Sequence, residues 1–324
     1  MTDSLLSRCA GKRESLPRRF GGPAALLLLG IGLVTAPAWA GKPTPYDTIN
    51  QAAASGPITV HRLRGGIAML DGSGGNIGVL VAPDGFLMVD AGIAVSERKI
   101  KAALRDLGGK RLRTVILTHW HWDHSDGDEW VRRTGANLIA DPVAIVRLKQ
   151  TNTIVEWGHT FTPVALSALP NETVPQDRTL NVGGEAVHIG HYRAGHTDGD
   201  IYVRFEHADV LQTGDTFWNG VYPFIDYVTG GSIDGAIRAA DENLRLAGPN
   251  TIVIPGHGPV GDRAGLMAFR NMLVAVRGKV AALKHEGKSL DATVAARPTA
   301  EFDAKWGGSV IDPNLFTALV YRGV

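Results

Sequence analysis

The sequence predicts a protein of mixed α and β structure, in which two β-sheets pack together and helices lie outside them. Short apolar stretches separated by glycine-containing turns fill residues 58–89, and a second run of such stretches fills residues 179–213. Apolar runs of this length between turns are typical of strands. Longer segments with a helical spacing of apolar residues follow each run. We therefore expect one α+β domain.

The first strand-rich half follows residues 41–55, which are polar and small and which we expect to form a docking arm. Strands are expected at residues 58–63, 67–70, 77–81 and 86–89. Turn residues such as Gly65-Gly66 and Asp71-Gly72 separate them, which predicts an antiparallel meander. A helix over residues 96–107 that ends at Gly108 leads to a buried strand over residues 112–117.

Beyond this strand the sequence predicts alternating helices and strands. Helices are expected at residues 128–133, 142–150, 232–247 and 263–286. Strands are expected at residues 137–140, 179–182, 187–191, 200–205, 210–213 and 251–254. Residues 151–175 lack clear periodicity and predict a surface loop or a lid over a site, and residues 293–324 predict a mixed helical and irregular tail.

Residues 1–40 have the features of a secretory signal peptide. Basic residues precede an apolar run over residues 23–34, and a small-x-small cleavage site ends at Ala40. The run is shorter than the roughly twenty residues that span a bilayer. We expect cleavage after Ala40, export to the periplasm of a Gram-negative bacterium, and a mature domain over residues 41–324. An uncleaved anchor is the alternative, and Arg18-Arg19 give a weak hint of twin-arginine export.

Charge and cysteine content restrict the partners of the mature chain. The leader holds five of the 33 basic and two of the 32 acidic residues, which leaves 28 and 30 and a formal net charge of −2. Such a balance gives no electrostatic footprint for nucleic acid or an anionic membrane, so we expect a small-molecule substrate and no stable membrane association. The single cysteine, Cys9, lies in the leader, so a metal would be held by His, Asp, Glu and water.

Residues 118–124, with the sequence THWHWDH, crowd three imidazoles and a carboxylate into six positions. Nitrogen and oxygen donors without sulfur suit zinc, iron or manganese. Extended geometry would put His119, His121 and Asp123 on one side and direct His124 elsewhere, which fits two metals better than one. The alternative is a histidine-rich surface loop. The cluster follows a buried strand, however, and open α/β folds place their sites at strand ends.

Three further loops after predicted strands each place a His or Asp beside glycine. They contain His196 in AGHTDG, Asp215 in TGDT and His257 in PGHGP. Glycine allows the backbone to turn tightly, so that a ligand can converge on a shared site. A single glycine-flanked histidine is usually an ordinary loop residue, but these pieces occur together and in a fixed order.

This ordered set resembles the metallo-β-lactamase superfamily, whose signature His-x-His-x-Asp-His is followed by His, Asp and His. The resemblance covers residues 90–257 and implies a four-layer αβ/βα sandwich. It implies that a first metal is bound by His119, His121 and His196. A second metal would be bound by Asp123, His124 and His257, and Asp215 would bridge the two metals. Asp90 matches the first motif of the family, an acidic residue that orients its surroundings rather than binding metal.

The resemblance implies a hydrolase with two zinc ions, with iron or manganese as other candidates. Two such cations about 3.5–4 Å apart lower the pKa of a shared water, and the resulting hydroxide attacks a carbonyl carbon. Asp123 and Asp215 are the candidate catalytic residues, because either carboxylate could orient the nucleophile or accept its proton. A structural zinc site is the alternative, but closed structural sites favour thiolate ligands.

The substrate is less well specified than the site. True β-lactamases of the superfamily mostly carry Cys or Ser where this chain has Asp215, whereas aspartate is more typical of glyoxalase II-like thioesterases, lactonases and phosphodiesterases. Export argues against a glutathione thioester, which leaves a β-lactam, a lactone or another ester or thioester. An iron-dependent oxidoreductase or sulfur dioxygenase on the same fold is the alternative function.

Aromatic residues near the ligands are candidates for the walls of a substrate channel, although ordinary core packing is the more common role of such residues. The candidates are Trp120, Trp122, Phe217, Trp218, Tyr222, Phe224 and, as a polar member, Asp226. His188 and His191 match no ligand position, and neither do His61, His159, His207 and His285.

Overall fold

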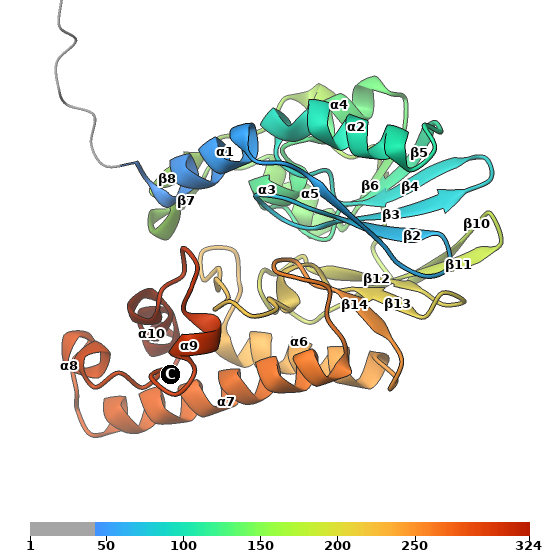
Figure 1. The fold of residues 1–324 in the computed structure, drawn as a ribbon. Helices are drawn as coiled ribbons and strands as arrows, with labels where there is room; N and C mark the ends of the chain where they lie inside the picture. Colours follow the sequence, from blue (N-terminus) through green and yellow to red (C-terminus); the bar gives the residue numbers. More distant parts are fainter. Residues whose placement is uncertain (1–42) are drawn as a thin grey trace, which may run out of the picture. The chain divides into compact units, whose positions relative to one another are not determined.

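Two β-sheets lie face to face in the computed structural model, which describes residues 43–324, and helices cover the outer side of each sheet (Figure 1). This is the four-layer αβ/βα sandwich that the resemblance implies. The proposed leader over residues 1–40 lies outside the described residues. Among the helices of the described part, none is long and apolar enough to cross a membrane.

The first sheet has seven strands in the order β1-β2-β3-β4-β5-β6-β9. Their bounds are β1 Thr59–Arg62, β2 Ile67–Asp71, β3 Ile77–Ala82, β4 Gly85–Val89, β5 Leu112–Ile116, β6 Asn137–Ala140 and β9 Glu172–Thr173. Strands β1 to β4 form the predicted antiparallel meander, and β4, β5, β6 and β9 run parallel. The parallel part delivers the histidine-rich motif, which follows β5.

The second sheet has five strands in the order β10-β11-β12-β13-β14. Their bounds are β10 Arg178–Val182, β11 Glu185–His191, β12 Ile201–Phe205, β13 Val210–Gln212 and β14 Ile252–Ile254. The first four are antiparallel neighbours, and β14 pairs with β13 in parallel. The loops after β11, β13 and β14 contain His196, Asp215 and His257.

Apolar side chains of both sheets fill the layer between them. Met69 and Leu87 of the first sheet belong to the same buried cluster as Val187, Val203 and Phe205 of the second. The opposite faces pack against helices, so the central strands are buried on both sides. Burial on both faces explains why these strands are almost continuously apolar in sequence.

The helices form two outer layers. Those of the N-terminal half are α1 Pro45–Ser55, α2 Glu97–Asp106, α3 Trp122–Ser125, α4 Asp128–Arg133 and α5 Pro142–Leu148. Those of the C-terminal half are α6 Ile233–Leu246, α7 Arg263–His285, α8 Leu290–Ala295, α9 Asp303–Trp306 and α10 Pro313–Arg322. Figure 1 shows α6 and α7 side by side beneath the second sheet, with α8, α9 and α10 gathered at one end of α7.

Two predictions about irregular segments are wrong. Residues 45–55 form helix α1 rather than a polar arm, because Thr44 caps the helix in a capping box with Asp47 and Pro45 occupies the first turn. Residues 151–175 contain a hairpin of β7 Asn152–Ile154 and β8 His159–Phe161, as well as β9. Phe161 stacks on Trp122, so aromatic packing orders a segment that has no periodic pattern.

Candidate metal centre

The histidine-rich motif leaves β5 as a loop and then forms a single helical turn. β5 ends at Ile116, His121 occupies the position before α3, and Asp123 and His124 lie within that helix. The expectation that extended geometry continues through Asp123 is therefore wrong. The helical turn directs Asp123 and His124 toward a second group of ligands, so the predicted division of the motif into two directions is nevertheless present.

Asp90 lies directly after β4 and joins the motif to the first sheet. Its backbone has a φ of 70°, a left-handed conformation that is uncommon for residues other than glycine and recurs at functional sites. Its carboxylate accepts hydrogen bonds from the Thr118 backbone N–H at 2.7 Å, the Thr118 hydroxyl at 2.9 Å and His124 Nδ1 at 2.9 Å. Asp90 thus holds a histidine ring from behind, in agreement with the orienting role implied by the resemblance.

The structure brings all seven predicted ligands together, although they come from four separate segments of the chain. One group consists of His119, His121, His196 and Asp215, and the other of Asp123, His124 and His257; within each group the ligand atoms lie within 4.8 Å of one another. All are buried except His257, whose side chain is 17% exposed. The remaining histidines of the described residues belong to neither group.

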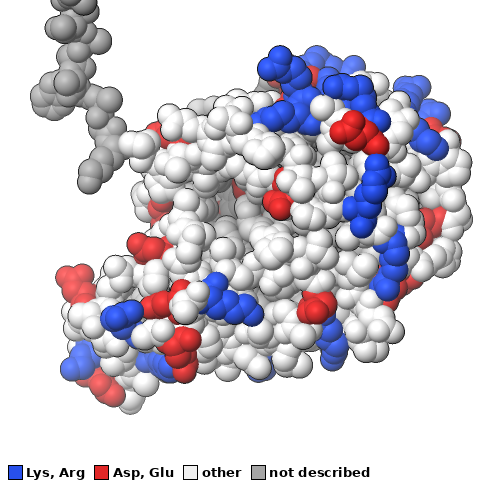
Figure 2. Space-filling model, viewed as in Figure 1, with Lys and Arg blue, Asp and Glu red and all other residues white. Residues whose placement is uncertain are grey.

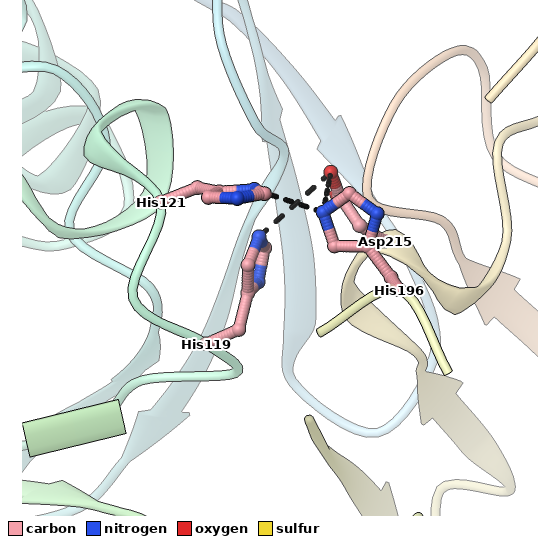
Figure 3. Close-up of side chains that lie close together, drawn as sticks. All are labelled: His119, His121, His196 and Asp215. Carbon is pink, nitrogen blue, oxygen red and sulfur yellow. Dashed lines mark hydrogen bonds and ion pairs between the residues drawn. The ribbon is translucent and has the colours of Figure 1, made fainter. Parts of the chain in front are cut away.

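In the first group three imidazoles face the carboxylate of Asp215 (Figure 3). His196 Nε2 lies 3.3 Å and His119 Nε2 lies 3.8 Å from Asp215 Oδ2. His196 Nε2 also lies 2.8 Å from His121 Nδ1. These atoms face a common point between the end of the first sheet and the loops of the second.

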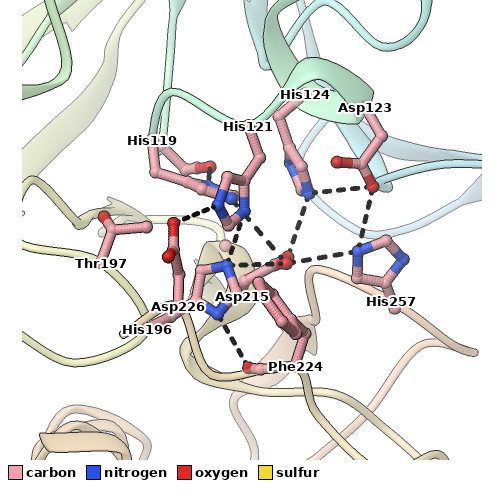
Figure 4. Close-up of polar contacts among 12 residues, drawn as sticks. His119, His121, Asp123, His124, His196, Thr197, Asp215, Phe224, Asp226 and His257 are labelled. Carbon is pink, nitrogen blue, oxygen red and sulfur yellow. Dashed lines mark hydrogen bonds and ion pairs between the residues drawn. The ribbon is translucent and has the colours of Figure 1, made fainter. Parts of the chain in front are cut away.

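Asp215 also touches the second group, so its carboxylate lies between the two (Figure 4). Its Oδ1 lies 3.0 Å from His124 Nε2, and its Oδ2 lies 3.3 Å from His257 Nε2. His257 Nε2 is in turn 3.3 Å from Asp123 Oδ2. A carboxylate shared by two ligand groups has the geometry that a bridging ligand requires.

The outward nitrogens of four of these rings have hydrogen-bond acceptors. His121 Nε2 donates to Asp226 at 2.9 Å, and His196 Nδ1 donates to the Phe224 carbonyl at 3.0 Å. His124 Nδ1 donates to Asp90, and His119 Nδ1 donates to the Thr118 hydroxyl oxygen at 3.0 Å. Such partners hold the rings in place and leave the other nitrogen of each ring facing the interior of the cluster.

The interior of the cluster leaves several buried polar atoms without a hydrogen bond. His196 Nε2 and His121 Nδ1 face each other at 2.8 Å, and four further buried atoms make no hydrogen bond: His119 Nε2, His124 Nε2, His257 Nε2 and Asp215 Oδ1. Unpaired buried polar atoms are costly. A cation in each group would give these atoms a partner, and the donor set of imidazoles and carboxylates suits zinc, iron or manganese. The residues therefore fit a metal-binding cluster.

Burial sets the charge of several ligands. It holds the pKa of His196 at about 3, and burial together with the neighbouring His124 holds the pKa of His119 well below its ordinary value. Both rings are thus neutral at pH 7 and offer lone pairs. Burial alone would raise the pKa of Asp215, but the surrounding histidines, His257 first, lower it well below its ordinary value, so Asp215 is ionised.

The predicted aromatic candidates have different surroundings. Trp218 lies beside the site, with its ring centroid 4.0 Å from that of His257. Phe217 packs on Phe269 and Tyr222 stacks on Phe316, so these two belong to the core. The others are buried around the motif, and the ring centroid of Phe224 lies 6.0 Å from those of both His121 and His196: Trp120, Trp122 and Phe224.

Two buried carboxylates have roles that the sequence pattern did not reveal. Asp226, expected to line a channel, instead accepts the hydrogen bond of His121. Asp200 accepts the backbone N–H groups of His196 and Thr197 at 2.7 and 2.9 Å and so shapes the His196 loop, and its burial raises its pKa to about 7. Asp200 stands only four residues after His196, and this short spacing could have indicated a contact with the His196 loop. Asp226 is 105 residues from His121, so no local pattern could have indicated their hydrogen bond.

Asp226→Asn is expected to weaken metal binding about 10–100-fold, the usual effect of losing a carboxylate partner of a ligating histidine. Although burial would raise it, the hydrogen bond from His121 holds the pKa of Asp226 at about 2, so a full charge is lost in the variant. Competition with a chelator measures the affinity. Asp234→Asn, at an exposed carboxylate paired with Arg277, is the control. Equal affinity of parent and Asp226→Asn would refute the role of Asp226.

Comparisons with known proteins agree with this geometry. Residues 70–257, more than half of the chain, match the metallo-beta-lactamase superfamily. An uncharacterized protein of Mycobacterium tuberculosis is 31% identical over 156 residues, which cover 44% of this chain and 68% of that protein. The probable metallo-hydrolase YqgX of Bacillus subtilis is 24% identical over 189 residues, which cover 56% of this chain and 84% of that protein.

A solved structure shows the same fold. The DIM-1 metallo-beta-lactamase superposes with a TM-score of 0.53 and 21% identity, over 67% of this chain and 97% of that one. The region that matches the superfamily, residues 70–257, begins in β2 and ends at His257. It therefore contains Asp90 and all seven residues of the cluster. On this evidence the chain belongs to the metallo-beta-lactamase superfamily.

Proposed function

We propose that the chain is a hydrolase that holds two divalent metal ions, with zinc as the preferred candidate. Its substrate is a carbonyl compound such as a lactone, another ester or thioester, or a β-lactam. The observation that carries the proposal is the convergence of seven imidazole and carboxylate side chains in two groups that share contacts with Asp215. Membership of the superfamily and the name of the B. subtilis relative support the same class of reaction.

The ligand set supports two ions rather than one. His119, His121 and His196 form the first set, Asp123, His124 and His257 form the second, and Asp215 lies between them. When bound, two such ions would lower the pKa of a water and polarise a carbonyl. The carboxylates of Asp123 and Asp215 would offset part of the added positive charge, and either is placed to orient the attacking water or accept its proton.

The test is a metal analysis combined with a screen of substrates. The protein is purified without added metal, its metal content is measured, and hydrolysis of nitrocefin, acyl-homoserine lactones, thioesters and phosphodiesters is followed with and without zinc. We expect about two zinc ions per chain, as paired sites of this kind hold, and turnover that a chelator abolishes. Iron with a visible absorbance and no hydrolysis would favour the oxidoreductase alternative and contradict the proposal.

We also propose export, on the sequence of residues 1–40 alone. A basic segment, an apolar run and a small-x-small site support removal of the leader after Ala40. Mass spectrometry of the protein from a periplasmic extract is expected to find a chain that begins at Gly41. A chain that retains Met1 in the membrane fraction would contradict the proposal.

A further inference from the structure

His257 differs from the other ligand histidines in the way its ring is held. Four rings have a hydrogen-bond partner outside the cluster: His119, His121, His124 and His196. The hydrogen bonds of residues 43–324 include none to the ring of His257, whose Nε2 lies 3.3 Å from both Asp123 and Asp215. Outer partners orient a ligating ring. The position of His257 must therefore be set by other contacts.

One side of the His257 ring borders a cavity. The side chain is 17% exposed, the highest value among the seven ligands. The cavity has a volume of about 310 Å³, and Ile49 of α1 and Val310 of the loop before α10 belong to its wall. Figure 2 shows a hollow between α1 and the C-terminal helices. The backbone of the His257 loop, together with the packing of the ring on Trp218, therefore has to place this ligand.

Asn76 holds the His257 loop from the opposite sheet. It is buried and directly precedes β3 of the first sheet, whereas His257 follows β14 of the second. The side-chain amide of Asn76 donates to the carbonyls of Pro255 at 3.0 Å and Gly258 at 2.9 Å. Its backbone N–H donates to the Gly256 carbonyl at 2.8 Å. Three donors of one residue thus bind three carbonyls on the two sides of His257.

The turn that contains Asn76 also contacts the rest of the second group. The backbone N–H of Gly75 donates to the Asp123 carbonyl at 3.2 Å, and Gly75 lies against the ring of His124. The Asn76 carbonyl accepts a hydrogen bond from the buried Gln212 side chain at 3.3 Å. No hydrogen bond of Gly75 or Asn76 reaches the three histidines of the first group. The turn between β2 and β3 therefore contacts all three residues or loops of the second group.

We infer that Asn76 is a positioning residue for the second metal ion, because its amide fixes the His257 loop and so brings His257 Nε2 to Asp123 and Asp215. Asn76 acts through the backbone of the loop and not as a ligand. Without the amide, the carbonyls of Pro255 and Gly258 lose their donor, which is costly for buried groups. The inference rests on the proposed function for the presence of a second ion, though not for the order of the loop.

Stepwise zinc binding tests the inference. Metal-free parent protein and Asn76→Ala are titrated with zinc in competition with a chelator, which gives a first and a second dissociation constant. We expect the second constant to rise about 10–100-fold, the usual effect of losing an outer partner of a metal site, and the first to be unchanged. Circular dichroism checks that the variant is folded.

Two further variants separate the hydrogen bonds from the volume of the side chain. Asn76→Asp keeps the shape of asparagine but has no N–H donor, so we expect it to weaken the second ion at least as much as Asn76→Ala does. Asn76→Ser keeps one donor and is expected to have an intermediate effect, and it replaces the alanine variant if that variant does not fold.

Asn152→Ala is the matched control. Asn152 is also a buried asparagine, and its amide donates to two backbone carbonyls, those of Arg147 at 2.9 Å and Gln150 at 3.4 Å. It belongs to neither group of ligands. We expect Asn152→Ala to lower the melting temperature of the metal-free protein, as Asn76→Ala does, and to leave both zinc affinities unchanged. A purely structural role of Asn76 would give the same result in the two variants.

Hydrogen–deuterium exchange of the metal-free proteins separates the inference from the proposed function. The backbone N–H of Gly256 donates to the Phe217 carbonyl at 3.0 Å, and we expect it to exchange faster in Asn76→Ala, while the His196 loop is unchanged. A parent protein that binds a single zinc ion would contradict the proposed two-metal hydrolase, and faster exchange at Gly256 would still support the role of Asn76.

Three results would overturn the inference even if the parent binds two zinc ions and is active. The first is unchanged exchange at Gly256 in Asn76→Ala, and the second is an equal effect of the variant on both zinc affinities. The third is an Asn76→Asp variant that binds the second ion as tightly as the parent does, because the N–H donors of Asn76 would then have no part in placing His257.

Discussion

Replacing His121 with alanine is expected to lower hydrolysis at least about a hundredfold, because loss of an outer partner of a metal ligand alone costs 10–100-fold. The ring of His121 supplies Nδ1 to the first group of ligands, 2.8 Å from His196 Nε2. Without it, the proposed first metal keeps two histidines and the shared Asp215. The activity of the metal-loaded variant, measured on the best substrate of the screen, checks this prediction.

The same variant should remain folded. Asp226 loses the bond from His121 but keeps those from the Val228 and Thr229 backbone N–H groups and from the Thr229 hydroxyl. The melting temperature of metal-free protein is therefore expected to change by only a few degrees, as for a loss of about 1–2 kcal/mol. His188→Ala, at a strand histidine bonded to Thr179, is the control. Unchanged turnover in His121→Ala would contradict the assignment of His121 as a metal ligand.

Local sequence signals were sufficient to find the seven residues that the structure brings together and the meander of β1 to β4. The ligands stand at strand ends beside glycine, and alternation between apolar strands and turns marks the meander of β1 to β4. These signals are local, because each depends on residues within a few positions of one another. The two-sheet arrangement followed from the same signals only in outline, and the resemblance supplied the four layers.

Contacts between distant segments could not be predicted in this way. Asp226 meets His121 across 105 positions, and no local pattern distinguishes it from any other loop aspartate. Helix α3 begins where an extended loop was expected, because a turn of four residues is too short to show a helical period. A cavity beside Asp123 and His257 is lined by Ile49 of α1 and Val310 of the loop before α10, and neither segment carries a motif that would place it there.

Gly75→Ala is expected to remove the second metal and keep the first. A methyl group at Gly75 would lie 2.2 Å from Cε1 and 2.4 Å from Nε2 of His124, far inside contact distance. The ring has no room to retreat, because it is fully buried and its Nδ1 is bonded to Asp90. His124 Nε2, which faces Asp215 at 3.0 Å, would therefore be displaced. The first group, which contains neither residue, would remain intact.

Metal analysis after dialysis distinguishes this selective loss from general unfolding. The ratio of zinc to protein is expected to fall from about two to about one, and hydrolysis is expected to fall at least about tenfold, because a paired site uses both ions to stabilise the attacking and leaving atoms. Gly278→Ala is the matched control, since a methyl group there meets no atom within 4 Å and alanine favours the helical conformation of α7. Retention of two zinc ions by Gly75→Ala would show that His124 tolerates displacement or that it does not hold the second ion, and the division of the seven ligands into two sets would then have to be redrawn.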